Sequence, residues 1–185
     1  AEMPGFYADD DYDMAGFAVG VAKKNKIING SGIKEGDRLV GLKSSGVHSN
    51  GYSLVRKLFP PVKEDLERFD AELGESPAQA LLRPTRIYVK TILSLIEKHP
   101  IKGIAHITGG GFVENIPRIL PEGLAAKIDR SSYEIPALFK ALQRRSGISD
   151  EKMYNTFNMG TGLCVAVAAD KADEALRVLK ESGEE

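Results

Sequence analysis

Short apolar runs and longer amphipathic stretches follow one another along this chain, and the two patterns predict strands and helices respectively. The apolar runs predict strands at residues 14–22, 38–42, 103–107, 124–128 and 163–169. The amphipathic stretches predict helices at residues 52–59, 85–98, 136–145 and 171–182, with shorter helices beginning at Phe112 and Ser149. Strands and helices do not alternate strictly. We therefore predict an α+β fold, a mixed β-sheet flanked by helices, and not a doubly wound parallel fold.

The stretches between these elements also have a readable pattern. Pro60 and Pro61 end the first helix, because proline lacks an amide donor and cannot continue a helical turn. Residues 62–76 are charged and weakly patterned, which predicts an exposed, partly helical excursion. The acidic cluster at residues 9–13 indicates a solvated linker, so residues 1–13 are set apart from a domain that spans residues 14–185.

Composition narrows the class of protein. The 185 residues are 42% hydrophobic, enough for one sizeable core. A net charge of −1 leaves no broad basic surface for nucleic acid, and no apolar run is long enough to cross a membrane. The only cysteine, Cys164, lies in the last apolar run, which predicts a buried strand thiol and excludes an internal disulfide or a cysteine-based metal site. A cytoplasmic location fits this pattern.

The first candidate binding site lies in the loop directly after the strand at residues 38–42. A loop rich in small polar residues separates this strand from the helix at residues 52–59, an order that gathers backbone N–H groups for an anion. The candidate ligand-binding residues are Ser44, Ser45, Gly46, Ser49, Asn50 and Gly51. The alternative is a polar loop that caps a helix and binds nothing.

Three histidines are candidates for polar chemistry. His48 lies in the same polar loop, where it could donate a hydrogen bond to a phosphate or shuttle a proton. The alternative is a loop histidine tied to a neighbouring carbonyl. We favour a ligand-facing role over general-base catalysis, because no carboxylate partner for a general base is identifiable. His106 lies inside a strand and is predicted to be satisfied within the sheet, whereas His99 ends a helix and is predicted to be exposed.

A second glycine-rich loop repeats the order of strand, loop and helix. It comprises Thr108, Gly109, Gly110 and Gly111, and it lacks the lysine of a nucleotide-binding P-loop. A triple glycine alone is ordinarily a tight turn, but two such loops in one domain are a stronger signal. Asn158 and Gly160 form a further turn before the last strand.

Four stretches resemble one family. They are AEMPGFY at residues 1–7, GLKSSGVHSNGYSLVRK at 41–57, AHITGGGFVENIPR at 105–118 and TFNMGTG at 156–162. Together they resemble aminoimidazole ribonucleotide synthetase, also called phosphoribosylformylglycinamidine cyclo-ligase. Members of this family are much longer, with an N-terminal domain that carries most of the ATP and metal site and the main dimer contact. The resemblance implies that residues 1–13 end an interdomain motif and that residues 14–185 are the C-terminal substrate-binding domain.

The resemblance also implies an activity. Members use ATP and Mg²⁺ to close formylglycinamidine ribonucleotide into 5-aminoimidazole ribonucleotide, releasing ADP and phosphate, in purine biosynthesis. The three polar segments would then contact the substrate, His48 would face the reacting groups, and Glu2 would belong to the cofactor site. No metal ligand is expected in this chain. The partners implied are its own N-terminal domain and a second copy of the full-length protein, and the isolated chain is expected to be inactive.

Two other readings remain open. Formylglycinamidine ribonucleotide synthetase, selenophosphate synthetase and thiamine-monophosphate kinase share the two-domain architecture. A domain whose glycine loops only shape a protein interface is the non-catalytic alternative.

Overall fold

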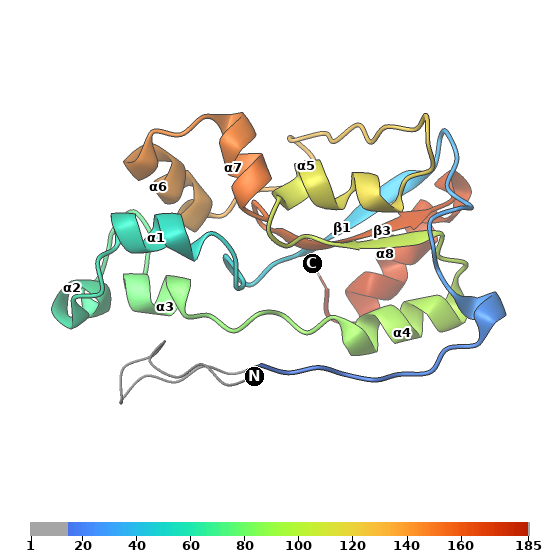
Figure 1. Cartoon of the computed structure of the whole chain (residues 1–185), viewed down its shortest axis with the longest axis horizontal. Coiled ribbons are helices and arrows are strands. Elements are labelled where there is room, and N and C mark those ends of the chain that lie inside the picture. Colours follow the sequence, from blue (N-terminus) through green and yellow to red (C-terminus); the bar gives the residue numbers. More distant parts are fainter. Residues whose placement is uncertain (1–14, 185) are drawn as a thin grey trace, which may run out of the picture.

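The computed structural model describes residues 15–184, which contain a small sheet covered by helices on both faces (Figure 1). The three strands are β1 (Arg38–Lys43), β2 (Gly103–His106) and β3 (Thr161–Val167). Their order is β1-β3-β2, and both pairings are antiparallel. Strand β3 is therefore central, with Val165 opposite Val40 on one side and Ile104 on the other.

Helices surround this sheet. They are α1 (Tyr52–Leu58), α2 (Lys63–Glu67), α3 (Pro77–Leu81), α4 (Val89–Lys98), α5 (Gly111–Asn115), α6 (Ala137–Ser146), α7 (Asp150–Thr156) and α8 (Ala172–Glu181). Short 3₁₀ turns occur at η1 (Lys24–Lys26), η2 (Pro117–Ile119) and η3 (Ala169–Lys171). Within residues 15–184, no helix has the length and apolar character needed to cross a membrane.

The alternation of side chains along β3 divides the core into two layers. Leu163, Val165 and Val167 face α4 and α8, where they pack with residues such as Leu95 and Val178. Cys164 faces the opposite layer, which α1, α5, α6 and α7 build. All seven residues of β3 are buried, because neighbouring strands flank it and helices cover both faces. Burial raises the pKa of the Cys164 thiol to about 12, so the predicted buried strand thiol is confirmed.

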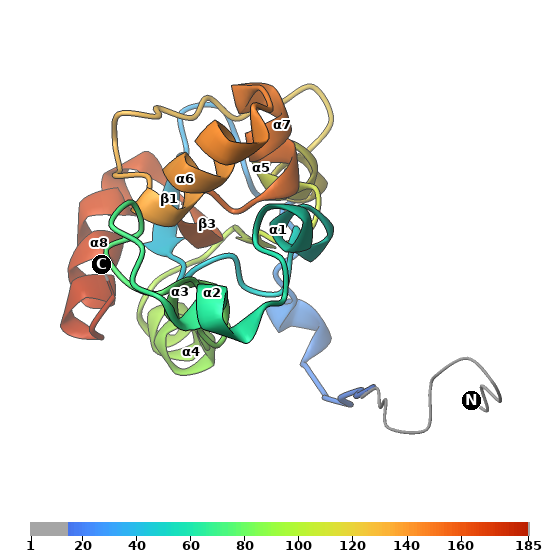
Figure 2. The same cartoon turned by 90° about the vertical axis from the view of Figure 1, so that its left-hand side faces the viewer.

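The predicted α+β class, with a sheet flanked by helices, is confirmed, as are three of the predicted strands. The strand predicted at residues 14–22 is wrong for residues 15–22, which are extended but form no strand. Phe17, Val19 and Val21 are 93%, 88% and 101% exposed, because no other strand of the described chain lies beside them. Figure 2 shows this segment leading away from the body of the domain. Met14 lies outside the described residues.

The strand predicted at residues 124–128 is also absent. The segment has no strand partner, although Ala126 and Ile128 are partly buried against the core. Its apolar alternation is therefore that of an extended segment lying on helices, which the sequence pattern cannot distinguish from a strand.

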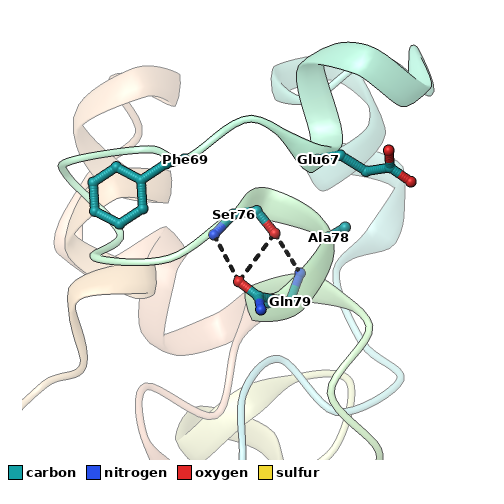
Figure 3. Close-up of a pocket in the computed structure, with 5 residues that line it drawn as sticks. All are labelled: Glu67, Phe69, Ser76, Ala78 and Gln79. Carbon is teal, nitrogen blue, oxygen red and sulfur yellow. Dashed lines mark hydrogen bonds between the residues drawn. The ribbon is translucent and has the colours of Figure 1, made fainter.

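Two helices differ from the prediction. Helix α4 begins at Val89 and not at Thr85, because the Pro84 carbonyl and the Arg86 amide are hydrogen-bonded to the loop after β1. Helix α3 was not predicted. Ser76 and Gln79 form a capping box at its first turn, and they line a shallow hollow with Glu67, Phe69 and Ala78 (Figure 3). No predicted site residue lines this hollow.

Candidate functional site

Residues 44–51, here called the first loop, connect β1 to α1 as predicted. Gly51 has a left-handed φ of 75° directly before α1, and a Cβ there would lie 2.2 Å from the ring of Phe157. Only glycine meets both conditions, so the sequence fixes a close approach of this loop to the core. His48 also has a left-handed φ, of 55°, which is costly for a residue with a side chain.

The side chain of Asn158 braces the first loop through hydrogen bonds. Its Oδ1 accepts hydrogen bonds from Ser44 Oγ and from the Gly160 amide, both at 2.9 Å, and its Nδ2 donates to the Gly46 carbonyl at 2.8 Å. The Ser44 amide donates to the Gly160 carbonyl at 2.8 Å. Asn158 is only 1% exposed, and these hydrogen bonds engage its side-chain amide with the first loop.

Residues 108–111, here called the second loop, are braced in the same way by Asn115. Its Nδ2 donates to the carbonyls of Gly111 at 2.8 Å, Gly109 at 3.1 Å and Thr108 at 3.4 Å. Its Oδ1 accepts from Thr108 Oγ1 at 3.2 Å. A Cβ on Gly111, where φ is 55°, would lie 2.0 Å from the Tyr154 carbonyl oxygen, so no larger residue fits.

The two loops lie side by side. A Cβ added to Gly109 would be 3.6 Å from Asn50 Oδ1 of the first loop. Ser49 and Gly109 are exposed, and Asn50 and Thr108 are half-buried. The fold thus joins two sequence-distant glycine segments into one surface that presents polar groups to solvent.

His48 is buried beneath this surface, with only 3% exposed. Its Nε2 accepts a hydrogen bond from the Ser45 amide at 3.1 Å and a long one from the Arg86 amide at 3.5 Å. Nε2 therefore carries no proton, and the hydrogen resides on Nδ1, which contacts no protein acceptor within residues 15–184. Burial lowers the pKa of His48, and the nearby charges of His106 and Arg86 lower it further, so the ring is neutral at pH 7.

A tight contact under the ring fixes its position. A Cβ on Gly162 would lie 2.6 Å from His48 Cε1 and 2.1 Å from Tyr88 Oη. Tyr88 Oη donates to the Lys43 carbonyl at 2.7 Å, and burial raises its pKa. The absence of a side chain at Gly162 is thus what allows Tyr88 and His48 to pack over β3.

Residues 83–88, here called the bracing segment, run along the outer side of the first loop. Ser45 Oγ donates to the Pro84 carbonyl at 2.6 Å, and Ser49 Oγ lies 3.5 Å from Thr85 Oγ1. Arg83 donates to the Ser45 carbonyl at 3.5 Å. No local pattern beyond Pro84 indicates this segment, because its contacts join positions 36 to 39 residues apart.

The structure brings together all the predicted site residues that it describes. The exposed or half-buried members are Ser44, Ser45, Ser49, Asn50, Gly51, Thr108, Gly109 and Gly110. The buried members are Gly46, His48, Gly111, Asn158 and Gly160. Glu2 lies outside the described residues. Sequence reasoning missed Arg86 and Gly162, and it did not recognise the bracing role of Asn115.

The other two histidines differ from the prediction in exposure. His106 lies in the sheet as predicted, at the end of β2 opposite Leu163, but its side chain is exposed. His99, predicted to be exposed, is only 6% exposed, with Nδ1 3.7 Å from a Glu174 carboxylate oxygen. No group of three or more His, Cys, Asp or Glu side chains suited to a metal ion occurs in the described part of the chain.

Comparison with known proteins agrees with this arrangement. The family model described as AIR synthase related protein, C-terminal domain, matches residues 34–185. Proteins named phosphoribosylformylglycinamidine cyclo-ligase from Acetivibrio thermocellus and Clostridium perfringens are 54% and 55% identical over the whole chain, which covers 54% of each. The protein of that name from Burkholderia mallei is 54% identical over the whole chain, which covers 52% of it.

The chain thus spans about half the length of the curated relatives it matches. Both glycine-rich loops, their bracing asparagines and the bracing segment lie within the matched residues. The chain belongs to the AIR synthase related family and corresponds to its C-terminal domain.

Proposed function

We propose that this chain is the substrate-binding half of an ATP-dependent cyclo-ligase that closes formylglycinamidine ribonucleotide into 5-aminoimidazole ribonucleotide. The observation that carries the proposal is the junction of the two glycine-rich loops, with Gly109 beside Asn50. The high identity to proteins named for this reaction supports it.

The joined loops would take the ribose-phosphate end of the substrate. Ser49, Asn50 and Thr108 offer hydroxyl and amide groups at the surface, and Gly109 leaves its backbone open to close approach. Because Asn115 and Asn158 already hold the loops, little conformational entropy would be lost on binding.

His48 is the proposed catalytic residue, in the role of a neutral hydrogen-bond donor. Its Nε2 lone pair is engaged by the Ser45 amide, so the ring is not arranged to act as a base through that atom. Its Nδ1–H is the group that remains to donate. A neutral donor suits a reaction in which an amidine nitrogen attacks a formyl carbon and the oxygen leaves with its electron pair.

ATP and Mg²⁺ would be held mainly outside this chain. The described residues contain no carboxylate cluster that fits a metal ion, and Glu2 remains a proposed contact to the cofactor site. When bound, ATP would supply the phosphoryl group that makes the formyl oxygen a good leaving group. We infer from this division that the isolated chain binds substrate without turning it over.

The proposed partners are an N-terminal domain of the same protein and, through it, a second copy of the full-length protein. Apolar side chains that a partner domain could cover stay exposed, among them Phe17, Val19 and Leu93. The single buried cysteine fits a cytoplasmic location.

The test is a titration of the chain with formylglycinamidine ribonucleotide, followed by backbone amide chemical shifts. We expect shifts at residues 44–51 and 108–111, weakened several-fold by Ser49→Ala because its exposed hydroxyl is removed. Ser31→Ala is the matched control, since Ser31 is exposed and its hydroxyl donates to Asn29, away from both loops. The same titration with ATP should leave both loops unshifted. Shifts at neither loop with formylglycinamidine ribonucleotide would refute the assignment.

A further inference from the structure

A buried carboxylate near the end of the chain is the starting point. Gly183, with φ 82°, turns the chain after α8, and the Glu184 amide donates to the Leu179 carbonyl at 3.0 Å. This turn places the Glu184 side chain against α4, where the residue is only 7% exposed. Carboxylates are rarely so buried unless they are paired, so the partners of Glu184 indicate its role.

Two partners hold the carboxylate. Glu184 Oε1 accepts a hydrogen bond from Thr91 Oγ1 at 2.9 Å, and Oε2 lies 2.9 Å from Arg86 Nη2. The same Arg86 nitrogen donates to the Gly183 carbonyl at 3.3 Å. The Arg86 guanidinium is thus held by the Glu184 carboxylate and the Gly183 carbonyl.

The backbone of Arg86 continues the connection to the candidate site. Its amide points to His48 Nε2 at 3.5 Å, the same atom that accepts from the Ser45 amide. Two residues further on, the ring of Tyr88 lies 6.3 Å from the His48 ring between centroids. Arg86 therefore contacts the chain end with its side chain and the imidazole with its main chain.

We propose that Glu184 is a positioning residue that, through Arg86, fixes the bracing segment against His48 and so sets the orientation of the imidazole. This role extends the proposed function, and its value for catalysis rests on that function. The effect of Glu184 on the orientation of His48 in the free chain can be measured whether or not the proposed function is correct. If Glu184 instead only packed the chain end against α4, its loss would leave His48 undisturbed.

The decisive variant is Glu184→Gln. It keeps the size of the side chain and the contact to Thr91 but removes the charge opposite Arg86. Glu181→Gln is the matched control, because the same chemical change occurs three residues earlier at an exposed carboxylate that pairs with the exposed Arg177. Neither variant changes a residue of the two loops.

The readouts are the imidazole ¹⁵N shifts of His48 and the hydrogen exchange of single amides in the free chain. We expect Glu184→Gln to move the Nε2 shift and to speed exchange at the Ser45 amide by about tenfold or more, as for the loss of an ion pair with a buried carboxylate. Amides of β3 should exchange at the original rate. Glu181→Gln should change neither readout.

Two outcomes would overturn the proposal. One is an unchanged His48 Nε2 shift in Glu184→Gln, and the other is an equal rise in exchange at Ser45 and throughout β3, which would signal general destabilisation. If Glu184→Gln folds poorly, Thr91→Val loosens the same carboxylate without altering charge, and it must then move the His48 Nε2 shift while exchange in β3 stays at the original rate. A positive result together with no substrate binding would refute the proposed function and leave the role of Glu184 standing.

Discussion

The strongest stability prediction concerns Asn158→Ala. The substitution removes three hydrogen bonds, to Ser44 Oγ, the Gly160 amide and the Gly46 carbonyl. Gly46 and Gly160 are buried, so water cannot readily replace the lost partners. With about 1 kcal/mol for each hydrogen bond and an added cost for buried groups left unpaired, the free energy of unfolding should fall by about 3–4 kcal/mol. For a chain of this size the melting temperature should fall by about 10 °C.

Urea denaturation followed by far-ultraviolet circular dichroism measures this loss, with calorimetry for the melting temperature. Asn155→Ala is the control, since Asn155 is exposed on α7 and should change stability by less than about 0.5 kcal/mol. A loss below about 1 kcal/mol for Asn158→Ala would show that the first loop keeps its shape without this side chain. The interpretation of Asn158 as its brace would then be wrong.

Three further predictions follow from the same structure. Gly162→Ala should lower the free energy of unfolding by about 2–3 kcal/mol in urea titrations, because a Cβ would lie 2.1 Å from Tyr88 Oη; an unchanged midpoint would contradict this packing. The pKa of His48 is lowered on folding, so the unfolded chain binds more protons below about pH 6.5, and stability should fall as the pH drops through that range, less so in His48→Gln. Lys102→Met should cost about 1–2 kcal/mol, because Asp37, with a side chain only 6% exposed, loses the Nζ partner of both its oxygens; a melting temperature equal to that of the original chain would count against it.

Much of the site could be predicted because its residues are contiguous. The first loop combines glycines and small polar residues directly after an apolar strand, a local pattern with a local physical reason. The second loop repeats that pattern. Their contact through Asn50 and Gly109 could only be inferred from the number of such loops, since no local signal places one beside the other.

The errors arise where tertiary contacts override local pattern. Residues 85–88 have a helical apolar spacing, but the Pro84 carbonyl accepts a hydrogen bond from Ser45 and the Arg86 amide donates one to His48. These two contacts hold the segment against the first loop and keep it out of the helix. Residues 15–22 alternate as a strand should, yet strand structure requires a neighbour that the described chain does not provide. Asn158 was predicted to contact substrate, a prediction that remains untested, and nothing in the sequence signals that its side chain is engaged by the first loop.

The central position of β3 has a consequence for how the domain forms. Within residues 15–184, strands β1 and β2 each pair only with β3, which comes last among the three strands in the sequence. During synthesis, residues 38–43 can therefore form their hydrogen bonds to β3 only after residues 161–167 have been made. Such distant pairing slows folding, and the apolar edges of β1 and β2 stay open until it is complete. Nascent chains that end before Thr161 should therefore be the aggregation-prone species, and chaperones that shield apolar segments should act on them.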